Sequence, residues 1–258
     1  MSMQGRILTV FSLVVLLAAA FSPVHADELL AVKAGYQLLS PKGSLSGSAA
    51  GDSRLNVKRD LDLDDSSGLT GEIALNWGQS RLSLNYLPIS FSGTSTMKFS
   101  GTFNSRTFAV NDRVKSDLDI ALYDVGYSYY LINIDSLPLR FQLGGELAVK
   151  VADAEVLFRN LNPDNRFTEK ESALVPIPTL GLRARAALAD FLGVTARVGY
   201  MEYSNNHFLD AEVQVEFSPL PLAGIYAGYR HFDLRIDESD VQVETDFSGP
   251  FGGLFVRF

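Results

Sequence analysis

One stretch of the sequence, residues 137–151, alternates between two kinds of side chain. The odd-numbered positions are apolar or glycine, whereas the even-numbered positions include Arg140, Glu146 and Lys150. Because successive side chains of a β-strand point to opposite faces, the stretch predicts a strand with one apolar face and one polar face. Its length also suits a transmembrane β-strand, which needs about 9–11 residues.

The same alternation recurs along the rest of the chain. Ten candidate strands lie near residues 28–40, 69–77, 81–86, 120–132, 137–151, 179–188, 194–203, 210–217, 222–234 and 246–258. We therefore expect an all-β fold, a transmembrane antiparallel up-and-down β-barrel of about ten strands, with eight strands as the alternative. A soluble β-sandwich or soluble barrel stays open as well, because composition alone does not say which face points inward.

The connections between these strands differ in length. Those near residues 78–80, 133–136, 189–193 and 218–221 are short, those near 41–68, 93–116 and 153–173 are long, that near 235–244 is intermediate, and that at 204–207 breaks the alternation. Short turns at one end and long loops at the other are typical of outer-membrane barrels, whose short turns are periplasmic. An even strand count then places both termini in the periplasm. Aromatic residues at the short-turn ends predict an interfacial girdle of Trp77, Tyr129, Tyr130, Phe191, Phe217 and Phe258.

Two local features interrupt the pattern. Apolar residues between 118 and 122 fall in the opposite phase to those that follow, which predicts a bulge or a segment outside the bilayer. Pro176 and Pro178 precede another candidate strand. Proline has no N–H to donate to a ladder, so we expect regular pairing of that strand to begin near Thr179.

The first 26 residues have the features of a secretory signal peptide. Arg6 supplies the positive charge, residues 7–20 form an apolar core too short for a spanning helix, and Val24-His25-Ala26 is a small-x-small cleavage site. Residues 27–258 would then form one barrel domain in the bacterial outer membrane. The sequence has no cysteine, which excludes disulfides, thiolate metal sites and a cysteine-linked lipid anchor.

The charge of the chain restricts its partners. Without the leader, 21 basic and 30 acidic residues remain, a net charge of −9. An acidic protein is a poor partner for nucleic acid, which is bound by clustered lysine and arginine. The expected partners are instead outer-membrane lipid and lipopolysaccharide.

The C-terminus carries a resemblance to a known group. Residues 249–258, GPFGGLFVRF, end an alternating strand on a phenylalanine and look like the insertion signal of Gram-negative outer-membrane proteins. By that resemblance the β-barrel assembly machinery would recognise Phe258, Val256 and Leu254 during biogenesis. The mature chain resembles the small outer-membrane β-barrel superfamily, which includes the OmpA transmembrane domain, OmpX and OmpW-like proteins, and no subfamily is assigned.

Charged residues gather on the polar faces that such a barrel turns inward. The principal ones are Arg140, Glu146, Lys150, Arg183, Arg185, Arg197, Glu212 and Glu216, accompanied by Lys33, Glu72, Arg81, Arg230 and Arg257. Barrels of about eight strands have interiors just wide enough for side chains to fill. Because buried charges are costly unless paired, the presence of both signs favours a filled lumen over a narrow conducting path.

No catalytic, cofactor-binding or metal-binding motif is recognisable. Asp60, Asp62, Asp64 and Asp65 lack the spacing of a calcium-binding EF-hand and are expected in a solvated acidic loop. Outer-membrane proteases use Asp and His, and lipid A deacylases use His and Ser, so the two histidines of the mature chain need attention. His231 and Asp233 share a strand face as a base and its orienting carboxylate would, and His207 lies at a loop tip; a rim position is the preferred interpretation for both histidines.

These observations favour a structural or surface-interaction role, with a filled lumen and long extracellular loops. A narrow pore or transporter for small or hydrophobic solutes is the alternative. A lipid-modifying enzyme or protease of the outer membrane is a less favoured one.

Overall fold

The computed structural model describes residues 29–47, 55–56, 58, 62–97, 100–103, 106–134, 140–204, 206–220, 222–238 and 241–258. The expected signal peptide, Asp60 and residues 137–139 lie outside these ranges. Among the described residues, no helix is long and apolar enough to cross a membrane.

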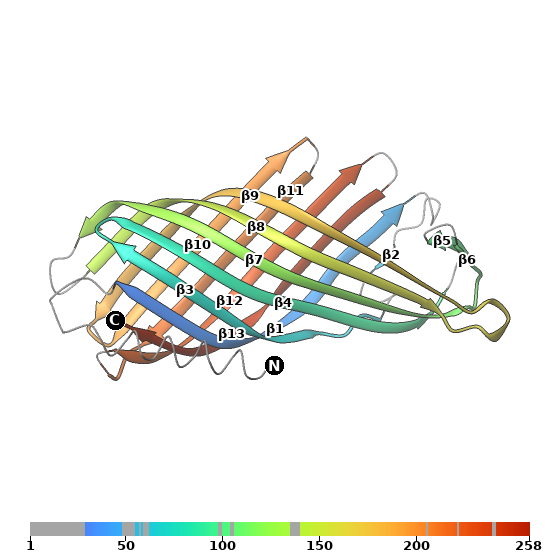
Figure 1. Cartoon of the computed structure of the whole chain (residues 1–258), viewed down its shortest axis with the longest axis horizontal. Coiled ribbons are helices and arrows are strands. Elements are labelled where there is room, and N and C mark those ends of the chain that lie inside the picture. The colour runs from blue at the N-terminus through green and yellow to red at the C-terminus, as the bar shows by residue number, and fades with distance from the viewer. Residues whose placement is uncertain are drawn as a thin grey trace, which may run out of the picture.

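Ten long antiparallel strands form the wall of one closed barrel (Figure 1). They are β1 (Leu30–Gly47), β3 (Ser66–Trp77), β4 (Ser80–Thr96), β7 (Arg113–Ile134), β8 (Arg140–Asn160), β9 (Phe167–Ala189), β10 (Leu192–Tyr203), β11 (Asn206–Phe217), β12 (Ala223–Glu238) and β13 (Val241–Arg257). The short β2 (Leu55–Asn56) pairs with β1, while β5 (Gly101–Phe103) and β6 (Arg106–Phe108) form a separate two-stranded sheet. The expected barrel is confirmed, with ten strands and not eight.

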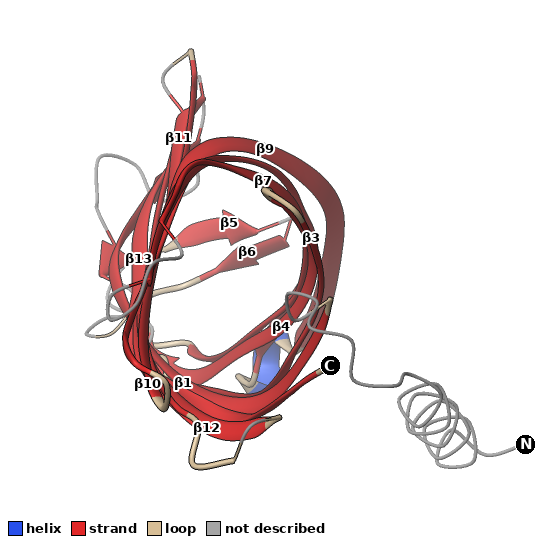
Figure 2. Cartoon of the chain, turned by 90° about the vertical axis from the view of Figure 1, so that its left-hand side faces the viewer, coloured by secondary structure: helices blue, strands red, loops and turns tan. Residues whose placement is uncertain are grey.

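The first and last strands close the barrel. β1 pairs with β13 from Ala31 opposite Arg257 to Gly47 opposite Val241. At the end of this seam, Leu30 N donates to Phe258 O at 3.1 Å, and Phe258 N donates to Leu30 O at 2.8 Å. Figure 2 shows the resulting ring along the barrel axis. Closure joins two strands that would otherwise each present an open edge, whose unpaired backbone groups cost several kcal/mol each in lipid.

The two faces of the wall differ in polarity as the alternation predicts. On β8, Leu147 and Val149 are exposed, whereas Glu146 and Lys150 beside them are 3% and 1% exposed. Exposed large apolar side chains occur on all ten barrel strands. The apolar face therefore points outward, which excludes the soluble alternative, because a soluble barrel buries that face.

The aromatic residues at the short-turn end are arranged mostly as expected. Trp77, Tyr129, Phe191 and Phe217 are exposed on the outer surface. Tyr130, which the sequence also suggested for the girdle, is only 6% exposed and faces the lumen. That expectation was wrong because consecutive residues of a strand point to opposite faces, so Tyr129 and Tyr130 cannot both contact lipid.

At the opposite end, strands continue where loops were expected. The segment expected as a loop at 153–173 is a hairpin in which β8 reaches Asn160 and β9 begins at Phe167, joined across a 3₁₀ turn, η2 (Pro163–Asn165). The expected loop at 235–244 is likewise mostly strand, since β12 ends at Glu238 and β13 begins at Val241. Together β4, β7, β8 and β9 project beyond the neighbouring strands (Figure 1). The sequence missed this because strands outside lipid need no apolar outer face.

The expected start of pairing near Thr179 is found only on the β10 side of β9. Pro176 and Pro178 lie within β9, opposite Val151 and Val149 of β8. In the described part of the chain, β10 pairs with β9 only from Leu180 onward, so the prolines lie where β9 has a neighbour on one side alone. Proline is tolerated at such an edge because no ladder bond is lost there.

The apolar segment 118–122 requires no bulge. Leu122 is buried and Leu118 and Ile120 are partly buried, all on the inward face of β7. The strand keeps its phase, and the lumen itself becomes apolar at this level. The register shift of β7 against β8 lies elsewhere, between Tyr130 and Ile132.

One buried carboxylate connects the projecting strands. Asp112, 2% exposed, accepts hydrogen bonds from Ala109 N at 2.9 Å, Asn160 Nδ2 at 2.6 Å and Asn162 Nδ2 at 2.5 Å. The Ala109 amide and the Asn162 side chain hold the pKa of Asp112 below its usual 3.8. The charged form therefore joins the start of β7 to the β8–β9 hairpin.

We expect Asp112→Ala to loosen this hairpin without unfolding the barrel. Trypsin cleavage after Arg159 and Arg166 should become at least several-fold faster, measured on folded protein in detergent micelles. Because the pKa of Asp112 is lowered by folding, its stabilising effect is present above about pH 4 and is lost as the pH falls below that value. Amide-exchange protection of residues 158–167 should thus decrease between pH 5 and pH 3. The side chain of Asp112→Asn cannot titrate. If that variant lost as much amide protection as the wild-type protein between pH 5 and pH 3, this role of Asp112 would be contradicted.

Candidate functional site

The inward faces of the ten strands carry a dense set of charged side chains. Of the eight charged residues that the sequence singled out, Glu146, Lys150, Arg183, Arg197 and Glu216 are buried, Glu212 and Arg185 are partly exposed, and Arg140 is exposed at the short-turn end. They come from β8, β9, β10 and β11, and the lumen brings them together.

The centre of the lumen holds two cations and two carboxylates. Lys150 Nζ lies 2.6 Å from Asp124 Oδ2 and 2.7 Å from Asp210 Oδ2. Arg197 bridges the same pair, with Nη1 2.7 Å from Asp124 Oδ2 and Nη2 2.7 Å from Asp210 Oδ2. All four side chains are at most 3% exposed. We call Asp124, Lys150, Arg197 and Asp210 the central cluster.

The central cluster includes two residues that the sequence analysis did not single out, Asp124 and Asp210. The alternation in the sequence could have indicated both residues, because each lies on the polar, inward face of its strand. Asp124 is also directly opposite Lys150 in the β7–β8 register. Asp210 was harder to find, since its lysine partner comes from β8, which is not a neighbour of β11 in the sheet.

Two further ion pairs extend the central cluster. Glu146 accepts hydrogen bonds from Arg183 Nε and Ser128 Oγ, both at 2.8 Å. Glu212 pairs with Arg230, and each of the two glutamates lies within 4 Å of Arg197, at 3.5 and 3.9 Å. Arg197 thus contacts four carboxylates, which offsets the like charge of Arg183 opposite it in the β9–β10 register.

A second set of pairs lies nearer the short turns. Glu216 contacts Lys33 Nζ at 3.0 Å and Arg257, and lies 3.7 Å from Arg185 Nη2. Glu72 accepts a hydrogen bond from Arg81 Nη2 at 2.7 Å. Both glutamates therefore have cationic partners, as a low-dielectric interior requires of a buried carboxylate.

Toward the long-hairpin end the lumen is apolar. Thirteen buried side chains form one cluster there: Leu39, Leu63, Leu87, Ile89, Phe91, Met97, Val114, Leu122, Phe158, Ile177, Phe208, Phe232 and Phe247. The rings of Phe91 and Phe247 stack across the interior with centroids 5.1 Å apart. The lumen thus holds a charged layer beneath an apolar layer.

The histidines lie apart from these layers, on the outer face of the wall. Asp233 lies 3.5 Å from His207 Nε2 across the β11–β12 ladder, and Tyr200 stacks on the His207 ring with centroids 6.4 Å apart. In the structure Asp233 therefore pairs with His207, whereas the sequence suggested a pair between Asp233 and His231.

The described carboxylates of the acidic loop face solvent. Asp62, Asp64 and Asp65 are exposed, and Asp65 pairs with Lys58 at 2.7 Å. Within the described ranges, no group of three or more His, Cys, Asp or Glu side chains is arranged to hold a metal ion.

A closed antiparallel barrel with an apolar exterior and a charged, paired interior defines the class of transmembrane β-barrels found in outer membranes. Comparison with protein-family models and with curated proteins finds no match.

Solved structures do match. The outer membrane protease OmpT from Escherichia coli has a TM-score of 0.56 and 11% identity, covering 93% of this chain and 99% of that one. The neisserial surface protein A, NspA, has a TM-score of 0.37 at 9% identity, covering 91% and 100%. Ail from Yersinia pestis has a TM-score of 0.35 at 10% identity, covering 87% and 97%. At 11% identity the likeness to OmpT is one of fold alone, and the subfamily stays unassigned.

Removing one member of the central cluster should strongly destabilise the barrel. Lys150→Met leaves Asp124 and Asp210 with one cation fewer in a buried site, a change that costs about 3–5 kcal/mol. Urea unfolding in lipid vesicles measures this difference. Lys170→Met is the matched control, because its 2.8 Å pair with Glu155 is exposed and such a pair contributes under about 1 kcal/mol. Equal losses in the two variants would show that burial does not set the cost.

Proposed function

We propose that this chain is an integral protein of the Gram-negative outer membrane with a sealed lumen and a structural or surface-interaction role. The short turns and both termini lie in the periplasm, and the long hairpins face the outside. The observation that carries the proposal is the filled lumen, in which the central cluster and the apolar layer lie one above the other.

The charged layer leaves little room for a solute path. Lys150, Asp124 and Asp210 have between 0% and 1% of their surface exposed, so water does not reach them freely. A pore for ions would instead have polar side chains in contact with water along its length. The apolar layer above adds a second barrier, because an ion entering it would lose its hydration.

The projecting strands supply the surface for interaction. In the described part of the chain, β9 has β8 as its neighbour but no strand beyond it from Phe167 to Thr179. A strand edge of this kind presents backbone donors and acceptors to which an extended partner segment can add. The exposed Leu174 and Val175 on the same segment offer apolar contacts.

The outward-facing end of β13 fits recognition by the β-barrel assembly machinery. Leu254 is 65% exposed and Val256 37% exposed, and Phe258 is partly exposed. Lipid and lipopolysaccharide would surround the apolar exterior, and the proposal includes no cofactor and no catalytic residue.

Planar-bilayer conductance tests the sealed lumen. The refolded protein, shown to be folded by its heat-modifiable mobility, should give no reproducible single-channel steps at 100 mV. Steps from the wild-type protein would contradict the sealed lumen and favour a narrow pore. A Phe91→Ala/Phe247→Ala variant should stay silent too, because the central cluster still blocks the path.

The assembly signal is tested separately in cells. Phe258→Ala keeps the two backbone hydrogen bonds to Leu30 and removes only the ring. We expect less heat-modifiable protein in the outer membrane, with unchanged refolding in detergent. Phe258→Tyr, which keeps an aromatic ring, is the control. Normal outer-membrane levels of Phe258→Ala would show that the assembly machinery does not recognise the terminal ring.

A further inference from the structure

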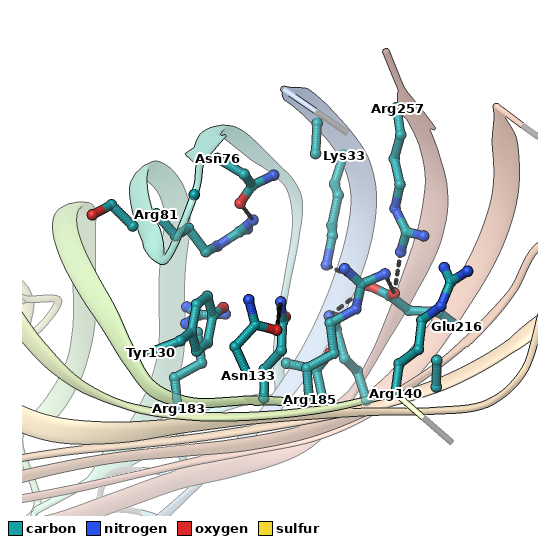
Figure 3. A pocket seen from close by; sticks show the side chains of 17 residues that line it. Lys33, Asn76, Arg81, Tyr130, Asn133, Arg140, Arg183, Arg185, Glu216 and Arg257 are labelled. Atoms are coloured by element: carbon teal, nitrogen blue, oxygen red, sulfur yellow. Dashed lines mark hydrogen bonds and ion pairs between the residues drawn. The ribbon is translucent and has the colours of Figure 1, made fainter. Parts of the chain in front are cut away.

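A cavity of about 480 Å³ opens in the lumen at the short-turn end. Its lining includes Gly78 of the β3–β4 turn and Asn133 near the end of β7, which place it at this mouth of the barrel. Figure 3 shows the labelled side chains converging on it from opposite parts of the wall. We call this cavity the vestibule.

The lining of the vestibule is strongly cationic. It contains six cationic side chains and one carboxylate, Glu216; the cations are Lys33, Arg81, Arg140, Arg183, Arg185 and Arg257. Two more carboxylates lie behind the lining, where Glu72 pairs with Arg81 and Glu146 pairs with Arg183. Among the described residues, the lining therefore has six cationic side chains and one carboxylate, in a chain whose formal net charge is −8. The cationic lining is local, and it is walled by the barrel, which focuses the potential on the space inside.

Two of the arginines also hold unused donors. Arg81 Nε and Arg183 Nη2 are buried and, within the described part of the chain, have no hydrogen-bond partner. Both residues line the vestibule, and Arg183 is only 3% exposed. A buried donor without a partner is costly, so an acceptor that reached these atoms would be favoured.

We propose that the vestibule binds a small, multiply charged oxyanion of the phosphate type. Arginine suits this chemistry, because its planar fork donates two parallel hydrogen bonds to phosphate or carboxylate oxygens. A lining in which cationic side chains predominate fits a ligand with several negative charges better than a monoanion. The volume lies within the range of small-molecule sites.

The inference goes beyond the proposed function but uses its orientation, which opens the vestibule to the periplasm. Two sources then share this chemistry, a soluble phosphorylated compound and the phosphate headgroup of a phospholipid. Binding by purified protein depends on neither orientation nor conductance, so the vestibule proposal and the sealed-lumen proposal can fail independently.

Isothermal titration with inorganic pyrophosphate tests the vestibule, using refolded full-length protein in a neutral detergent. We expect one saturable site whose affinity falls as salt rises. Arg140→Gln/Arg185→Gln should weaken binding at least tenfold, and these are the more exposed lining cations, so folding is least at risk. Arg159→Gln/Lys170→Gln removes the same charge from the far end of the barrel and should change affinity less than twofold.

Two isosteric or charge-conserving variants test the geometry. Arg81→Lys keeps the charge and loses the fork, so binding should weaken several-fold. Glu216→Gln removes the lining carboxylate that competes for Lys33 and Arg257, so binding should strengthen. Heat-modifiable mobility confirms folding of each variant.

Micelles doped with phosphatidylglycerol separate the two sources. Loss of pyrophosphate binding in doped micelles identifies a lipid headgroup as the occupant, whereas unchanged binding identifies a soluble anion. Absence of pyrophosphate binding to the folded wild-type protein at millimolar concentration, or equal weakening in the two double variants, would overturn the proposal.

Discussion

A backbone amide or carbonyl in the hydrocarbon layer has no water to bond, and this requirement sets the architecture of the protein. The ten strands meet it by pairing in chain order and by returning β13 to β1. Among the described residues, β9 is paired on one side only before Leu180. This edge carries Pro176 and Pro178, next to the point where pairing with β10 begins. At these two positions proline simply supplies no donor.

Closing the barrel creates an interior, in which side chains are removed from solvent and must pack against one another. Most inward side chains leave bulk water, so buried charges must be paired and gaps must be filled. The central cluster meets the first demand through Arg197 and Lys150, each shared between Asp124 and Asp210. The thirteen-residue apolar layer meets the second nearer the long hairpins. The vestibule differs from both layers, because it is an open cavity lined mainly by cationic side chains, and a ligand is inferred there for that reason.

The sequence predicted the barrel because two-residue periodicity is a local property that each membrane-spanning strand must show by itself. The prediction became inaccurate beyond the lipid. Residues 153–173 were expected to form a loop but extend β8 and β9, since strands in water need no apolar outer face. The segment 118–122 suggested a bulge or a segment outside the bilayer. Its apolar residues instead point inward without a bulge, into a lumen whose polarity changes with depth.

The sequence by itself determined the strands, the apolar and polar face of each strand and the charges that the polar faces carry, because these follow from alternation along single strands. Only the tertiary structure decided which face points outward and which charges meet. Lys150 reaches Asp210 across the lumen from a strand that is not its neighbour, and Lys33 reaches Glu216 in the same way. Such partners depend on the number and stagger of strands around the closed ring, and no local pattern in the sequence encodes that distance.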